Sequence, residues 1–429
     1  AMNVATEKSD SIILDGLYIY GPQFAYNCDY GLGGIVGSYA SSTVLTIMNI
    51  QINSTAVEVK IDPGYEGKHI NNLKYYTTPA CGLLLGYSAG LNINHSVAVD
   101  NAKVNNSCVL NAGYCGGLMG RPGRKTSISN TTIEGLTVYS QGAASYTGST
   151  RAGGILGSNG SGDVDIKNLT MKNVNVVSDG NTALIQGLIY NGTKQTVNHL
   201  KTENCIVATT QMRSVSNRYF YGVATDPGSD NKSITTDNYA GTAGLFLGVS
   251  KLTFNGLNLS DTLYGFNIGV KDLTLGYYCG NASELTYKYD KNDHTGHFTE
   301  NGSVIQLSAS NIGVYIEKTK SGKSYADIVA KDETKYSDSN QYTDGYLGFI
   351  VGAKNDCKTT NNGKEYESCT KIVGLSVQGG NYPYELNGYN DATVVKKTVD
   401  KEKGTVTCSG NSTGNNYVIF SDYNGNSFT

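Results

Sequence analysis

Residues 152–180 read AGGILGSNGSGDVDIKNLTMKNVNVVSDG, and this stretch contains the pattern that the rest of the chain varies. It opens on a glycine-rich apolar run, turns through Ser-Asn-Gly, and then alternates apolar with polar residues over 164–176. Such alternation indicates a β-strand with one buried face. Asn168 and Asn173 interrupt the alternation, and because asparagine tolerates a left-handed backbone we expect bends there. One unit of this kind cannot bury its apolar face alone, so it needs copies above and below it.

Similar opening runs recur along the chain as LGGIVG, CGLLLG, CGGLMG, AGLFLG and LGFIVG, with ALIQG as a weaker version. Together with AGGILG at 152–157 these make seven runs. Their final glycines are Gly37, Gly86, Gly120, Gly157, Gly187, Gly248 and Gly352. The middle steps of 34, 37 and 30 residues are the size of one solenoid turn, and we expect the longer gaps of 49, 61 and 104 residues to hold insertions. A repeat of this length is typical of stacked supersecondary units.

The Gly-Leu-hydrophobic-Gly core of several runs resembles the GLUG motif of bacterial surface proteins and secreted proteases. The resemblance covers these short runs and none of the long stretches between them. It implies a right-handed parallel β-helix on a secreted or wall-attached bacterial protein, often an adhesin. We therefore predict an all-β fold, a right-handed parallel β-helix (β-solenoid) with projecting loops. Residues 1–31 are expected to form N-terminal cap strands and residues 32–429 the β-helix, with loop insertions near 211–242 and 277–346.

Composition excludes several classes of protein. Only 16% of the residues are charged, the net charge is -3, and five arginines occur in 429 residues. Nucleic-acid binding needs clustered basic residues, so no nucleic-acid partner is expected. No apolar run approaches the roughly 18 residues of a membrane-spanning helix, so no membrane insertion is expected. We expect the chain to be a monomer within a longer surface protein.

The nine cysteines differ in their surroundings. Cys81 and Cys115 align with Ala152 in the repeat, which predicts small, buried and reduced side chains. Cys357 and Cys369 flank the polar segment KTTNNGKEYES, and we predict a disulfide between them. No Cys-x-x-Cys pair or His-Cys spacing occurs, so no metal site and no cofactor are predicted.

Tyrosine is abundant, at 32 residues against 9 phenylalanines and no tryptophan. These tyrosines either stack along edge strands with hydrated hydroxyls, or form contact surfaces on loops, because tyrosine offers rigid amphipathic area at low entropic cost. The contact-surface interpretation places ligand binding in the second half of the chain. The candidate ligand-binding residues are Arg218, Tyr219, Tyr221, Asp226 and Tyr239, with a neighbouring patch of Tyr287, Tyr289 and His294.

Function is predicted with its alternatives kept open. We expect the ligand-binding region of a bacterial cell-surface adhesin, extracellular and either wall-attached or secreted, which recognises a host or bacterial surface glycan or protein through tyrosine-rich loops. A secreted β-helix polysaccharide lyase or glycosidase is the alternative, although the acidic residues are scattered and no catalytic residue can be named. A structural stalk is the third possibility. His294 and His297 lie in a polar loop, where solvated histidines are the commoner outcome.

Overall fold

The computed structural model describes most of the first half of the chain and shorter stretches of the second. The described residues are 2–4, 11–26, 31–39, 44–59, 79–88, 96–123, 125–140, 150–159, 162–178, 180–189, 195–210, 213–215, 242–245, 247–250, 257–258, 266–278, 285–308, 312–313, 342–344, 346–348, 351–354, 358–361, 364–367, 375–377, 396–400 and 405–409. Within these ranges the regular structure is entirely β, without a helix. The predicted all-β class is therefore confirmed.

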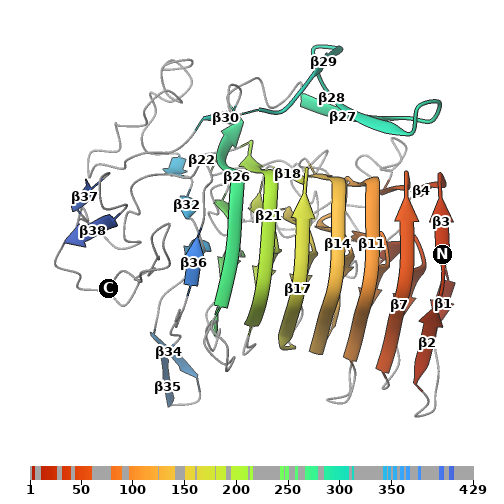
Figure 1. Ribbon diagram of the computed structural model, residues 1–429, viewed down its shortest axis with the longest axis horizontal. Helices are drawn as coiled ribbons and strands as arrows, with labels where there is room; N and C mark the ends of the chain where they lie inside the picture. Colours follow the sequence, from red (N-terminus) through yellow and green to blue (C-terminus); the bar gives the residue numbers. More distant parts are fainter. Residues whose placement is uncertain are drawn as a thin grey trace, which may run out of the picture.

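Three sheets of parallel strands dominate the molecule (Figure 1). Sheet A contains β1 (Met2–Val4), β6 (Val36–Tyr39), β10 (Leu85–Ser88), β13 (Met119–Arg121), β16 (Leu156–Asn159), β20 (Gln186–Ile189), β24 (Leu247–Ser250) and β33 (Val351–Lys354). Sheet C contains β5 (Gly31–Gly33), β9 (Ala80–Gly82), β12 (Tyr114–Gly116), β15 (Arg151–Gly153), β19 (Asn181–Ala183), β23 (Thr242–Gly244) and β32 (Tyr346–Gly348). Each neighbouring pair in these two sheets is parallel.

Sheet B holds the longest strands, which stand side by side in Figure 1. Its strands are β2 (Ile12–Asp15), β3 (Tyr18–Tyr20), β4 (Gln23–Tyr26), β7 (Val44–Asn53), β8 (Ala56–Val59), β11 (Ser96–Leu110), β14 (Lys125–Ser140), β17 (Val164–Lys172), β18 (Asn175–Ser178), β21 (Gln195–Thr209), β25 (Leu257–Asn258), β26 (Phe266–Tyr278), β30 (Ile312–Gly313) and β36 (Leu375–Val377). Only the β26–β30 pair is antiparallel among the pairs described in this sheet.

The chain visits the three sheets in a fixed order, from C to A to B, and then begins the next round. The rounds run β5–β6–β7, β9–β10–β11, β12–β13–β14, β15–β16–β17 and β19–β20–β21. The glycine-rich runs supply the short strands of sheets C and A, and their final glycines lie on β6, β10, β13, β16, β20, β24 and β33, which are successive strands of sheet A. The long alternating segments supply sheet B.

The glycines allow the backbones of successive rounds to approach each other closely. A methyl group at Gly117 would lie 2.0 Å from the carbonyl oxygen of Gly154 in the next round. A methyl group at Gly120 would lie 2.4 Å from the backbone nitrogen of Cys81 in the previous round. Both obstacles are backbone atoms that cannot rotate away, so a side chain larger than hydrogen does not fit there.

The core lies between the three sheets. Leu84, Leu118 and Ile155, at the position before the last strand of each glycine-rich run, are fully buried, as the repeat predicts. Ile35, at the first copy, is partly buried against the same core, and Phe246 lies outside the described residues. Cys81 and Cys115 are buried thiols outside any disulfide, also as expected.

The sheet B ladder bends twice in each round from β2 to β21, at residues with left-handed backbone. The first column of bends is Gly16, Asn49, Asn101, Asn130, Asn168 and His199, and the second is Gly21, Ser54, Asn106, Gly135, Asn173 and Asn204. Their φ values lie between 44° and 75°. The bends expected at Asn168 and Asn173 are confirmed. Because the bends occur at the same register in each strand, the ladder of hydrogen bonds continues through them.

Residues 285–308 form an antiparallel sheet of β27 (Leu285–Asp290), β28 (Thr295–Glu300) and β29 (Ser303–Ile305). We call this segment the strap, because it crosses the ends of several sheet B strands, at the top of Figure 1. The strap lies within the loop insertion expected near 277–346. An apolar strand pattern is visible at residues 304–307 of the sequence, but it carries no information on the direction of the partner strand.

Three further antiparallel pairs occur among the described residues from 213 onward. They are β22 (Arg213–Val215) with β31 (Tyr342–Asp344), β34 (Lys358–Asn361) with β35 (Lys364–Glu367), and β37 (Lys396–Asp400) with β38 (Thr405–Ser409).

Candidate ligand-binding surface

The first group of sequence-predicted site residues is not placed by the structure. Arg218, Tyr219, Tyr221, Asp226 and Tyr239 lie outside the described residues. Their role in binding stays a prediction.

The two cysteines of the predicted disulfide are not placed by the structure either. Cys357 and Cys369 also lie outside the described residues, so their pairing stays a prediction.

Tyr287, from the second predicted group, faces the body of the protein. Its ring packs edge-on against Phe298 with centroids 5.1 Å apart. Its hydroxyl shares hydrogen bonds with the side chains of Cys108 and Thr137, which lie on β11 and β14. Burial raises the pKa of Tyr287 well above its usual value. This tyrosine therefore anchors the strap to sheet B.

Tyr289 and His294 meet the first strands of the chain. The Tyr289 hydroxyl donates a hydrogen bond to the carbonyl oxygen of Ser54 and lies 3.4 Å from His294 Nδ1. The imidazole of His294 lies 5.6 Å from the ring of Tyr20, centroid to centroid. Tyr18 and Tyr20 remain 64% and 57% exposed. We call Tyr18, Tyr20, Tyr289 and His294 the aromatic corner, in which two exposed rings lie beside two partly buried ones.

The aromatic corner continues into a polar surface on sheet B. Between the two columns of bends, each strand turns two side chains outward, and the register aligns them from strand to strand. We call this surface the middle facet. Its outward residues are Gln51 and Asn53, Lys103 and Asn105, Thr132 and Glu134, Thr170 and Lys172, and Lys201 and Glu203, and Tyr18 and Tyr20 extend the same two rows.

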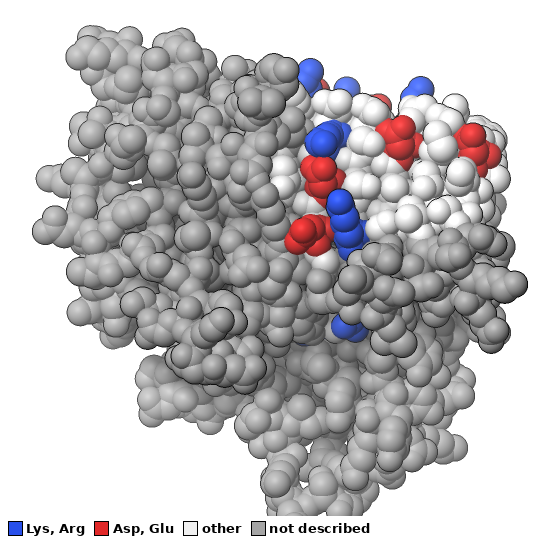
Figure 2. Space-filling model, turned by 90° about the horizontal axis from the view of Figure 1, so that it is seen from below, with Lys and Arg blue, Asp and Glu red and all other residues white. Residues whose placement is uncertain are grey.

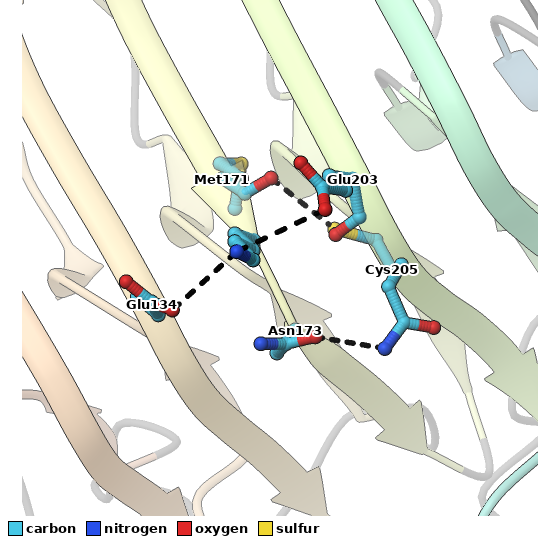
Figure 3. Close-up of polar contacts among 7 residues, drawn as sticks. Glu134, Met171, Asn173, Glu203 and Cys205 are labelled. Atoms are coloured by element: carbon cyan, nitrogen blue, oxygen red, sulfur yellow. Dashed lines mark hydrogen bonds and ion pairs between the residues drawn. The ribbon is translucent and has the colours of Figure 1, made fainter.

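Ion pairs cross the middle facet from strand to strand (Figure 3). Lys172 Nζ lies 3.8 Å from Glu134 Oε1 on one neighbouring strand and 3.8 Å from Glu203 Oε1 on the other. These side chains are close to half exposed, so each pair contributes at most about 1 kcal/mol. The row of outward side chains that contains Glu134, Lys172 and Glu203 is close to electrically neutral here. Beside it, Asn204 Nδ2 donates to Asn173 Oδ1 at 2.7 Å, at the second column of bends.

His297, on β28 of the strap, does not form a catalytic triad with its neighbours. Thr295 Oγ1 lies 2.7 Å from His297 Nε2, and Asp293 Oδ2 lies 3.7 Å from the same nitrogen. A triad needs the acid at one ring nitrogen and the hydroxyl at the other. The Asp293 carboxylate and Thr295 are also exposed. This arrangement is therefore a surface hydrogen-bond cluster.

Metal-ligating residues do not gather within the described part of the chain. No group of three or more His, Cys, Asp or Glu side chains there is arranged to hold a metal ion. Four described cysteines, Cys81, Cys108, Cys115 and Cys205, are buried thiols that are not part of a disulfide. Burial raises the pKa of the Cys115 thiol to about 12 and that of Cys205 to about 11. The thiols of Cys115 and Cys205 are therefore poor nucleophiles in the folded protein.

Sequence reasoning missed the strap contact, although a signal for it was present. Beyond the second bend, the strands of sheet B are apolar on both faces, as in Cys108-Val109-Leu110 and Ile206-Val207-Ala208. A strand that is apolar on both faces needs cover on both. The strap supplies the second cover, in a cluster separate from the core between the sheets. The cluster consists of Ala56, Cys108, Leu110, Tyr139, Val177, Ile206, Ala208, Leu285 and Phe298.

Comparison with known proteins gives no relative for this chain. No protein-family model, curated protein or solved structure matches it. In the described ranges, no helix has the length and hydropathy needed to cross a membrane.

Proposed function

We propose that the three sheets are the faces of a right-handed parallel β-helix. The fixed order of visits to sheets C, A and B supports this proposal, as does the parallel pairing of each strand with the equivalent strand one round earlier. Right-handedness follows from the general rule that connections between parallel strands of one sheet are right-handed in nearly all cases.

We further propose that the chain is the ligand-binding region of a bacterial cell-surface adhesin. In this proposal the protein is extracellular, wall-attached or secreted, and recognises a host or bacterial surface glycan or protein. The aromatic corner is the observation that carries the proposal. Two exposed tyrosines, Tyr18 and Tyr20, are held on strand β3, and the imidazole of His294, which contacts the Tyr289 hydroxyl, lies against the ring of Tyr20. Rigid, exposed aromatic side chains of this kind are typical of binding hot spots.

Two further features support a binding role. The GLUG-like runs resemble those of surface proteins. The candidate ligand-binding residues predicted in the 211–242 segment would add a second contact surface on the same chain.

A binding screen with paired variants tests the proposal. The full chain is immobilised and exposed to host and bacterial surface glycans and to matrix proteins. The double variant Tyr18→Ala/Tyr20→Ala should weaken binding of the ligand found by at least about tenfold, which corresponds to about 1.4 kcal/mol, without lowering the melting temperature. Tyr219→Ala/Tyr221→Ala is the matching test of the second surface.

Ile13→Ala is the matched control. Ile13 is 63% exposed on the neighbouring strand β2, so its replacement by alanine removes exposed apolar area outside the aromatic corner. Failure of the unmodified chain to bind any surface ligand would contradict the adhesin proposal. Unchanged binding in both tyrosine pairs would remove these two surfaces as the site.

A further inference from the structure

The outer face of sheet B repeats its polar groups at the spacing of the strands. Neighbouring strands in a β-sheet lie about 4.7–4.9 Å apart. This distance is close to the length of one pyranose unit in a linear, equatorially linked sugar chain. The in-register rows of the middle facet therefore offer polar groups at intervals that match successive sugar units along a polymer laid across the strands.

The first column of bends supplies amides with hydrogen-bonding capacity to spare. Asn49 Nδ2 donates to Asp15 Oδ1 at 2.8 Å, and Asn49 Oδ1 accepts from Asn101 at 2.7 Å. In the same way, Asn130 donates to Asp100 at 2.9 Å and accepts from Asn168 at 3.0 Å. An amide has two N–H donors and two acceptor lone pairs. Asn49 and Asn130 therefore each keep one donor and one acceptor beyond these bonds, and all four asparagines are exposed.

Charge on this face favours an uncharged ligand. The charged residues of β2, β7, β11, β14, β17 and β21 are five lysines (Lys103, Lys125, Lys167, Lys172 and Lys201) and five acids (Asp15, Asp100, Glu134, Asp165 and Glu203). Figure 2, which views the molecule from below, shows both signs among uncharged residues on the described part that is visible there. A polyanion would need an excess of cations, and this face has none.

We propose that the middle facet, with the first column of asparagines beside it, binds a linear, uncharged polysaccharide lengthwise, with about one sugar unit to a strand. The asparagine amides hydrogen-bond the sugar hydroxyls, and the exposed rings of Tyr18 and Tyr20 stack on the sugar faces at one end. This inference rests on the adhesin proposal and names the class of its ligand.

Oligosaccharides of increasing length test the proposal. The full chain is titrated with β-1,4-linked gluco-, manno- and chito-oligosaccharides from dimer to hexamer, and binding is measured by calorimetry. Affinity for at least one series should rise with each added unit, because each unit reaches another strand. A carboxylated form of the same chain should bind no better than the neutral form.

Variants at the bends separate the amides from the backbone. In Asn130→Gly/Asn168→Gly the amides are lost while the left-handed backbone is kept, as the chain itself shows at Gly16 in the same column. This variant should bind the hexamer at least about tenfold more weakly, since two ligand hydrogen bonds are removed. Asn111→Gly is the matched control, because Asn111 is also left-handed but lies beyond the end of β11, where it bonds Glu58.

The outcomes distinguish the two proposals. Binding of a surface ligand without length dependence, tighter binding of the carboxylated chain, or unchanged affinity in Asn130→Gly/Asn168→Gly would overturn the polysaccharide site and leave the adhesin proposal standing. Absence of binding to every glycan and protein in the earlier screen, and to all three oligosaccharide series, would overturn both.

Discussion

Replacing Phe298 by alanine should detach the strap while the three sheets stay folded. Phe298 is only 4% exposed, and its ring packs edge-on against Tyr139 at 5.7 Å and Tyr287 at 5.1 Å between centroids. Truncation of a buried phenylalanine costs about 3–5 kcal/mol. Since about 1.4 kcal/mol is a factor of ten, the population with an open strap should rise by about a hundredfold to a few thousand-fold.

Cys108 reports this opening directly. Its thiol lies in the cluster beneath the strap, where burial raises its pKa well above the usual value and suppresses its reaction with alkylating agents. Cys81, Cys115 and Cys205 lie in the separate core between the sheets. In Phe298→Ala, alkylation of Cys108 should accelerate by at least about a hundredfold, in step with the open population. Alkylation of the other three should not change. Timed alkylation under native conditions, followed by peptide mass spectrometry, measures each thiol separately.

Val304→Ala is the control for this experiment. Val304 lies on β29 of the same strap but is 63% exposed, so its truncation should leave all four thiols protected. Equal protection of Cys108 in the unmodified chain and in Phe298→Ala would refute the argument that burial of this ring holds the strap. A parallel rise at all four thiols would instead show that the strap and the sheets unfold as one unit.

Three other predictions follow from the sheets and the cysteines. Leu118→Ala should lower the free energy of unfolding in urea by about 2–5 kcal/mol, because it opens a cavity in a fully buried site. The pKa of Asp100 is lowered, chiefly by the hydrogen bond from Ser129, so the stabilisation is present above the unfolded pKa of about 3.9 and is lost as the pH falls through the folded pKa. Ser129→Ala should therefore reduce the loss of stability on acidification, measured as urea midpoints from pH 6 downward. Mass spectrometry of the non-reduced protein should find Cys357 linked to Cys369, with a contribution of about 3 kcal/mol to stability if the bridge is unstrained.

The parallel sheets could be predicted from the sequence because their signals are local. A run such as CGGLMG contains both short strands and the close backbone approach between them, so aligning the runs also aligns the strands of sheet A. The bends could be predicted for the same reason. Asn168 interrupts the alternation of its own strand, and asparagine is among the few residues that adopt left-handed backbone at low cost.

The strap could not be predicted in the same way because its partner is distant in the sequence. Tyr139 donates its hydroxyl hydrogen bond to Leu285, and Tyr289 bonds Ser54, so these contacts join residues separated by 146 and 235 positions. Alternation in residues 304–307 predicts a strand but leaves the partner open. The apolar outer faces of β11 and β21 did show that something must cover them, yet they do not say which segment does so.

The strap also changes what the abundance of tyrosine means. Phenylalanine would fill the same space at Tyr139 and Tyr289, but its ring could not satisfy the carbonyl oxygens that these hydroxyls bond. At such contacts the tyrosine hydroxyl is needed because the strap crosses the sheet where backbone carbonyl groups need hydrogen-bond partners. A tyrosine in this role is not evidence for a ligand. Tyr18 and Tyr20 are different, since both side chains are more than half exposed on strand β3. The exposed fraction, and not the number of tyrosines, therefore separates rings that hold the fold from rings available to a ligand. Among the tyrosines whose exposure is described, this criterion selects Tyr18 and Tyr20 on β3.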